Sequence, residues 1–300
     1  MRAMSSAAPR ASVVVRTLNS SETLGACLAS LTSQTIRPEI VIVDSGSTDA
    51  TLEIAARLAD RVVELPPGSF TYGRALNVGA AAAMAPVHFA VSSHCVIPRP
   101  DWIERSLRHY ERSDVAGTNG QPTRSDGSPL TETLVFTTDT PLANPLWGFS
   151  NHASSWRAEV WHREPFDESL IACEDFEWSD RVIARGYVIV FDPALTVPGH
   201  HLKAQGPLSL YRRSHREVLG AAACRNVNPM SAREAVAEWW SQHPSGTKRH
   251  RQRLSPYRVA RIAGRYTAGR AMRRHTRRGE PIGRLRTATG DGRSAAGGRP

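Results

Sequence analysis

The feature that most constrains the fold is an alternation of short apolar runs with longer amphipathic segments over the first 91 residues. The apolar runs, rich in β-branched residues, lie at Ser12–Val15, Glu39–Val43, Arg61–Leu65 and Val87–Val91. Segments with apolar residues at helical spacing separate them, at Glu22–Gln34, Asp49–Ala59 and Ala75–Ala85. This alternation predicts an α/β fold with a mainly parallel sheet that helices cover on both faces. Such sheets bind ligands beyond the carboxyl ends of their strands.

The rest of the chain is less regular. Further helices are expected at Asp101–Tyr110, Phe176–Arg185 and Ser209–Ala223, and a strand at Val188–Phe191. Gly117–Trp147, rich in Thr, Pro, Gly and Asp, predicts loops and mixed strands. We expect one α/β domain over residues 11–240, a basic helical tail over 241–286, and disorder at 1–10 and 287–300.

Charge is unevenly distributed along the chain. The 38 Lys and Arg stand against 28 Asp and Glu, a formal net charge of +10. Sixteen of the basic residues but only two of the acidic ones, Glu280 and Asp291, fall within 248–300. This leaves 22 basic and 26 acidic residues elsewhere, a net charge of −4. The basic character therefore belongs to the tail, which makes nucleic acid an unfavoured partner for the main domain.

The cysteines and the apolar segments indicate the cellular compartment of the protein. The four cysteines, Cys27, Cys95, Cys173 and Cys224, show no paired spacing, which argues against a disulfide framework or zinc site. Residues 1–12 lack the apolar region of a signal peptide, and no stretch approaches the roughly 18–20 apolar residues that span a bilayer. We expect a cytoplasmic protein.

An acidic turn follows the second apolar run. Val43 leads into Asp44-Ser45-Gly46-Ser47, so a strand delivers a carboxylate to the sheet edge and small residues let the backbone turn. Asp44 is placed to accept hydrogen bonds from a base or a ribose. A plain turn with a capping aspartate is the alternative.

Two runs, SVVVRTLN and VIVDSGSTDAT, together resemble the opening of inverting family-2 glycosyltransferases, which have the GT-A fold. The segment Gly68–Ala80 resembles one in the rhamnosyltransferase-like branch of that family. The resemblance covers roughly residues 11–215. It implies a nucleotide-sugar donor, with a dTDP- or UDP-sugar favoured. It also implies donor-binding residues at Arg16, Thr17, Asn19, Asp44 and Ser45.

Within the segment Gly68–Ala80, Gly73 and Gly79 permit close approach of the backbone. Arg74 offers a fork of donors to a phosphate, and Asn77 offers hydrogen bonds to a sugar or base. The alternative for Arg74 is an ordinary surface arginine, and the alternative for Asn77 is a structural asparagine.

The metal position departs from the family. Where the family carries D-x-D to hold a divalent ion against the diphosphate, this chain reads Ser92-Ser93-His94. Ser92 and Ser93 remain candidate donor contacts. We predict a divalent metal, Mn²⁺ or Mg²⁺, bound by His94 with His200 or His201, because no dense Arg or Lys cluster is expected near the site to replace it. Neutralisation of the diphosphate by Arg74 and a protonated histidine is the alternative.

Acidic residues open the helix that carries Trp178. Glu174, Asp175 and Glu177 are also ordinary partners for a helix dipole. The pattern E-D-x-E-W resembles the acceptor-site motif of the same family, in which the Asp is the general base, and Asp175 is the matching residue, with Glu174 beside it. A carboxylate within reach can take the proton of an acceptor hydroxyl as it attacks with inversion.

The tail interleaves arginines with apolar residues over Pro256–Arg278. A basic, partly amphipathic helix predicts an anionic membrane surface as partner, which suits a saccharide or lipid-linked acceptor and peripheral attachment at the cytoplasmic face. A solvated arm and nucleic-acid binding are the alternatives. A nucleotidyltransferase acting on a sugar phosphate is the competing enzyme class, but Ser12–Ser21 lacks the basic, glycine-rich loop that it needs.

Overall fold

The structure, a computed structural model, describes residues 8–198, 206–241 and 255–283. Of the ends predicted to be disordered, residues 1–7 of 1–10 and all of 287–300 lie outside the described residues, as do His200 and His201.

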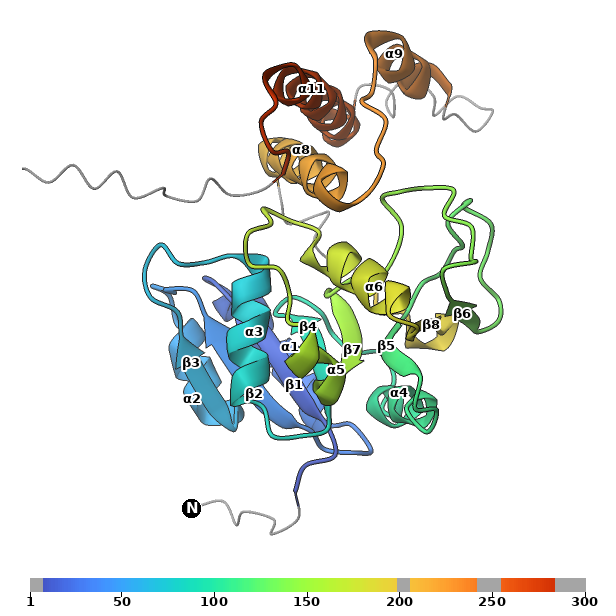
Figure 1. The fold of residues 1–300 in the computed structure, drawn as a ribbon. Helices are drawn as coiled ribbons and strands as arrows, with labels where there is room; N and C mark the ends of the chain where they lie inside the picture. The colour runs from blue at the N-terminus through green and yellow to red at the C-terminus, as the bar shows by residue number, and fades with distance from the viewer. Residues whose placement is uncertain (1–7, 199–205, 242–254, 284–300) are drawn as a thin grey trace, which may run out of the picture.

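An eight-stranded sheet forms the centre of the molecule (Figure 1). Its strands are β1 (Ser12–Thr17), β2 (Glu39–Asp44), β3 (Arg61–Glu64), β4 (Val87–Ser92), β5 (Val115–Asn119), β6 (Leu134–Phe136), β7 (Ala153–Arg157) and β8 (Val188–Phe191). Their order is β3-β2-β1-β4-β7-β5-β8-β6. The first four strands pair in parallel, whereas β7 runs antiparallel to both β4 and β5, and β6 antiparallel to β8. The sheet is mixed and mainly parallel, as the sequence predicts.

The helices are α1 (Ser21–Thr32), α2 (Thr51–Leu58), α3 (Tyr72–Ala82), α4 (Trp102–His109), α5 (Ala158–Arg163), α6 (Glu174–Ala184), α8 (Pro207–Cys224), α9 (Ala232–Ser241) and α11 (Pro256–Arg278), with a short 3₁₀ turn, η1 (Pro193–Leu195). α3 begins three residues before its predicted start because the Thr71 hydroxyl caps it, accepting from the Arg74 N–H at 3.0 Å.

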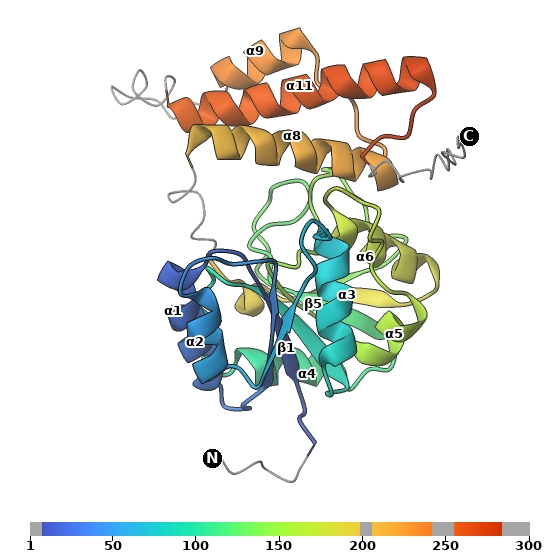
Figure 2. The same cartoon turned by 90° about the vertical axis from the view of Figure 1, so that its left-hand side faces the viewer.

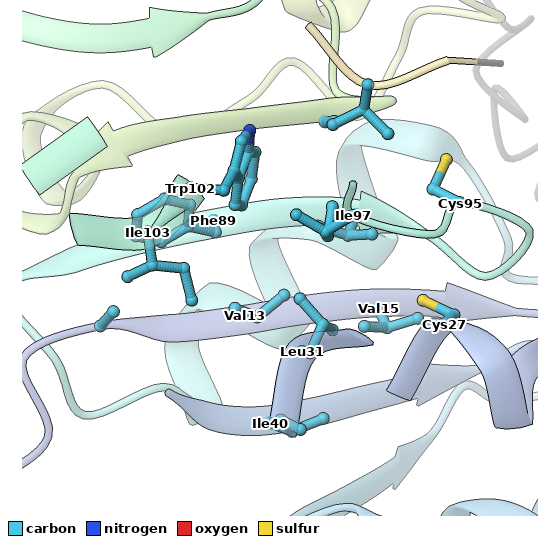
Figure 3. Close-up of a cluster of buried hydrophobic side chains, with 14 of the residues drawn as sticks. Val13, Val15, Cys27, Leu31, Ile40, Phe89, Cys95, Ile97, Trp102 and Ile103 are labelled. Atoms are coloured by element: carbon cyan, nitrogen blue, oxygen red, sulfur yellow. The ribbon is translucent and has the colours of Figure 1, made fainter. Parts of the chain in front are cut away.

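Alternating side chains of the strands point to opposite faces of the sheet, and each face carries its own core. On one face, Val13, Val15 and Phe89 pack with α1 and α4, as Figure 3 shows. On the other face, Val14 and Val43 pack against α3. A Cβ added to Gly79 of α3 would lie 2.3 Å from Val14, which confirms the predicted close approach at this glycine.

The C-terminal helices form a further layer beyond the carboxyl edge of the sheet (Figure 2). α11 lies along α8, so closely that a Cβ on Gly264 would fall 2.5 Å from the Tyr211 carbonyl oxygen. Arg265 of α11 pairs with Glu238 of α9 at 2.7 Å. The described part of the tail is therefore a packed helix and not a solvated arm. Among the described helices, none combines the length and apolar content that crossing a membrane requires.

Candidate active site

A cavity of about 600 Å³ lies between the carboxyl edge of the sheet and α8, a volume typical of small-ligand sites. Several elements contribute to its wall, among them Arg16 of β1, Tyr72 of α3, Ser92 of β4, Glu174 and Asp175 of α6, and Arg212, Arg213 and Arg216 of α8. The cavity thus brings together one end of the sheet, the acidic start of α6 and a basic face of α8.

Arg16 connects the end of β1 to α6. Its guanidinium donates to the Asn151 carbonyl at 3.0 Å and lies 3.6 Å from the Glu174 carboxylate. It also lies over the ring of Tyr72, 5.5 Å from the centroid. The Arg16 side chain is only 13 % exposed, so these contacts hold a positive charge in place at the cavity wall.

The two acidic residues at the start of α6 are held differently. Cys173, immediately before them, has a left-handed backbone (φ 66°), a conformation that costs a non-glycine residue free energy and recurs at functional sites. Asp175 accepts hydrogen bonds from the backbone N–H groups of Asn151 at 3.1 Å and Phe176 at 3.0 Å. Glu174 is buried, whereas Asp175 keeps part of its surface on the cavity.

These surroundings change the acidity of both groups. Burial raises the pKa of Glu174, against the opposing charge of Arg16. Burial, followed by the neighbouring charge of Glu174, raises the pKa of Asp175 to about 7, although the N–H donors of Asn151 and Phe176 act in the other direction. A carboxylate with a pKa near neutrality, partly open to a cavity, is suited to general-base catalysis.

The turn after β2 is organised around Asp44. Its fully buried carboxylate accepts from Thr17 Oγ1 at 2.8 Å, from Ser47 Oγ at 2.6 Å, and from the N–H groups of Gly46 and Ser47. Burial would raise the pKa of Asp44, but the hydrogen bonds from Ser47, Thr17 and Gly46 outweigh it and the pKa is lowered. Asp44 is therefore a charged residue that holds the turn, and its contact with a base stays a prediction.

Other predicted donor-binding residues also join loops at this edge. The Asn19 side-chain oxygen accepts from the Thr48 N–H at 2.8 Å, which links the turns after β1 and β2. The hydroxyls of Ser93 and Ser20 lie 2.9 Å apart and link the turns after β4 and β1. The buried Ser45 hydroxyl has no hydrogen-bond partner within the described residues. Ser92 lines the cavity directly.

Arg74 and Asn77 lie away from the cavity wall. Asn77 donates to the Phe166 carbonyl and to Glu168, and its oxygen accepts from Trp161 Nε1 and the Phe166 N–H. The amide is fully hydrogen-bonded inside the protein, so the structure gives Asn77 the structural role and not the donor contact. Arg74 is not among the described residues that line the cavity.

A histidine–cysteine group occupies the position where the sequence predicts a metal. Potential ligand atoms of His94, Cys95 and His152 lie within 4.8 Å of one another. Cys95 Sγ is 3.3 Å from Nδ1 of His152, and Nε2 of His152 is 3.1 Å from the Val197 carbonyl oxygen. Cys95 also packs in the core, and burial raises the pKa of its thiol to about 12. The sequence does not assign His152 as a ligand, because β7, which follows it, lacks the pattern of a strand.

This group does not fit the predicted ion. It offers two imidazoles and a thiol but no carboxylate, whereas Mg²⁺ and Mn²⁺ prefer oxygen ligands. Nitrogen and sulfur donors suit softer ions such as Zn²⁺. We therefore assign no catalytic step to a hard cation held there.

The expectation that no arginine cluster lies near the site was wrong. Arg212, Arg213 and Arg216 of α8 line the same cavity as Arg16. The sequence gives no sign of this proximity, because α8 is far from β1 along the chain and reaches the cavity only through tertiary packing.

Comparison with known proteins agrees with this architecture. Residues 12–168, more than half of the chain, match the family model for glycosyl transferase family 2. Glycosyltransferase AglE of Haloferax volcanii is 26% identical over 207 residues, which cover 63% of this chain and 66% of that protein. O-antigen chain rhamnosyltransferase WbaN of Salmonella anatum is 27% identical over 185 residues, 56% and 58% of the two chains. The match thus spans less than two thirds of either relative.

The fold has a counterpart among solved structures. Mannosyltransferase PcManGT from Pyrobaculum calidifontis, solved with GDP-Man and Mn²⁺, superposes with a TM-score of 0.58 at 16% identity, covering 91% of this chain and 76% of that one. At this identity the likeness concerns the fold alone. The family match and the shared sheet confirm the resemblance that the sequence motifs carry: this chain belongs to glycosyl transferase family 2 and has the GT-A fold.

Proposed function

We propose that this protein transfers a sugar from a nucleotide-sugar donor to an acceptor hydroxyl with inversion, and that Asp175 is the general base. The observation that carries the proposal is the Asp175 carboxylate, whose pKa is raised to about 7 and which faces a cavity at the carboxyl edge of the sheet. Family membership supports the reaction class.

The proposed reaction needs one carboxylate, Asp175, beside the cavity that holds donor and acceptor. Asp175 takes the proton of the acceptor hydroxyl while the hydroxyl oxygen forms a bond to the anomeric carbon. The bond from that carbon to the diphosphate oxygen breaks, and the diphosphate leaves with the electron pair. Because attack comes from the side opposite the leaving group, the anomeric configuration inverts in one step, and no covalent enzyme intermediate is needed.

We propose a dTDP- or UDP-sugar as donor and a saccharide or lipid-linked acceptor. The Salmonella rhamnosyltransferase supports a deoxysugar donor, whereas the Pyrobaculum enzyme binds GDP-Man, so GDP-sugars belong in any test. The Pyrobaculum enzyme also binds Mn²⁺. The His94, Cys95 and His152 group lacks the carboxylates that Mn²⁺ prefers, so no step proposed here depends on that ion.

A donor screen tests the proposal. The full-length protein is incubated with dTDP-, UDP- and GDP-sugars and a set of synthetic alkyl glycosides, and both released nucleotide and glycosylated product are measured. We expect acceptor-dependent release from one donor class. Binding of the nucleotides without any product across the whole panel, or release that no acceptor increases, would count against the proposal.

A further inference from the structure

The wall of the cavity that α8 forms carries three arginines. Arg212 and Arg216 are four residues apart on α8 and so share one face of that helix, with Arg213 beside them. Arg213 is paired with Glu217 at 2.6 Å. Among the described residues, by contrast, no carboxylate lies within 4.0 Å of a side-chain nitrogen of Arg212 or Arg216. Within the described residues, both guanidiniums line the cavity outside any ion pair, although the charge of Arg216 opposes the rise in the pKa of Glu174.

Arg216 is held in position by Tyr72. It donates to the Tyr72 hydroxyl at 2.9 Å, and its guanidinium lies 5.3 Å from the ring centroid, while Arg16 lies 5.5 Å from the same ring. The buried Nε of Arg216 has no hydrogen-bond partner within the described residues. One tyrosine thus contacts two arginines that are 200 residues apart in the sequence, and both line the cavity.

The helix that carries these arginines is anchored on both sides. A Cβ on Gly220 of α8 would lie 2.4 Å from the Ala172 carbonyl oxygen, just before the acidic start of α6. On its other side, His215 hydrogen-bonds the Thr267 hydroxyl of α11 at 3.0 Å. The packed tail therefore supports α8 against the cavity. Arg216 is held in place there by Tyr72, whereas Arg212 is exposed at the cavity wall.

We propose that Arg212 and Arg216, together with Arg16, form a phosphate-binding site in this cavity that neutralises phosphate charge in place of a hard cation. The inference rests on the proposed function and names the ligand chemistry of the same site. Guanidinium groups match phosphate oxygens in charge and in fork geometry, and fixed donors stabilise a diphosphate as it gains charge on leaving. The phosphate belongs either to the nucleotide-sugar donor or to a lipid-phosphate acceptor.

Calorimetry with inorganic pyrophosphate in EDTA tests the site itself. The full-length protein is compared with Arg212→Gln, Arg216→Gln and the matched control Arg270→Gln, which removes an exposed arginine of α11. We expect wild type and control to bind alike, and each α8 variant to bind about tenfold more weakly or worse. Thermal melting checks that the variants fold, and because Arg212 is exposed, its variant remains informative if Arg216→Gln melts early.

Two further probes identify the source of the phosphate. Weaker binding of UDP, dTDP or GDP by the α8 variants assigns the site to the donor, and weaker binding of farnesyl phosphate alone assigns it to the acceptor. Pyrophosphate binding that requires an added divalent ion, or equal affinities in the α8 variants and the control, overturns the inference. Failure of every donor to support transfer would reject the proposed function, yet the pyrophosphate measurements would still decide the inference.

Discussion

Two aspartates near the same edge of the sheet, the buried Asp44 and the half-buried Asp175, have pKa values shifted in opposite directions. Asp44, the last residue of β2, accepts four hydrogen bonds, and its pKa is lowered. Asp175, at the start of α6, accepts two backbone hydrogen bonds and lies beside Glu174, and its pKa is raised to about 7. Both lose water on folding, so the number of donors and the sign of the neighbouring charge decide the difference.

The difference in surroundings favours Asp175 over Asp44 as the general base that we propose. Asp44 is ionised and accepts hydrogen bonds from Thr17, Gly46 and Ser47, which hold its turn. Asp175 gains and loses its proton in the neutral range and keeps surface on the cavity. Sequence motifs single out both residues equally; the surroundings distinguish them.

The largest expected effect is on turnover in Asp175→Asn. The amide cannot take the acceptor proton, and a general base contributes typically 10²–10⁴-fold to the rate. We therefore expect transfer to fall by that factor, measured as glycosylated product, while calorimetry shows nucleotide affinity nearly unchanged. Wild-type turnover in this variant would show that Asp175 is not the general base, and its raised pKa would then have no catalytic meaning.

The next effect is on stability in Asp44→Ala. Four donors around a buried site lose their acceptor, and we expect the free energy of unfolding to drop by about 1–3 kcal/mol in urea denaturation. Asp139→Ala, which removes an exposed aspartate, serves as a matched control with little expected change. An unchanged free energy of unfolding together with a large loss of nucleotide affinity would instead make Asp44 a direct ligand residue, as the family resemblance implies.

The smallest effect is a displacement of the pH profile. Asp175 acts as a base only when deprotonated, so wild-type activity should fall as the pH drops through about 7. Glu174→Gln removes the charge that helps raise the pKa of Asp175, so the acid side of the profile should move to lower pH. Activity at neutral pH should change little. Glu159→Gln, at an exposed ion pair, is the control, and identical profiles in both variants would show that Glu174 does not tune Asp175.

Much of the N-terminal half follows from the sequence alone. Val13 and Val15 on one face of β1, and Val14 on the other, follow the period of a strand buried on both sides. The strand ends then bring Arg16, Asp44 and Ser92 to one edge, because parallel strands share a direction. Asp175 was found from its motif, but its raised pKa depends on the burial beside Glu174 that only the fold provides.

Tertiary structure alone decided the rest. β7, with the sequence Ala-Ser-Ser-Trp-Arg, lacks the apolar alternation of a strand, yet it lies between β4 and β5 and places His152 beside Cys95. Asn77 hydrogen-bonds to a segment that is distant in the sequence. The arginines of α8 are likewise distant in the sequence from the sheet residues that line the cavity with them. The spacing of apolar residues shows which face of a helix or strand is buried, because each buried position by itself favours an apolar residue. Which elements meet across the cavity depends on packing between distant segments, and no local pattern encodes it.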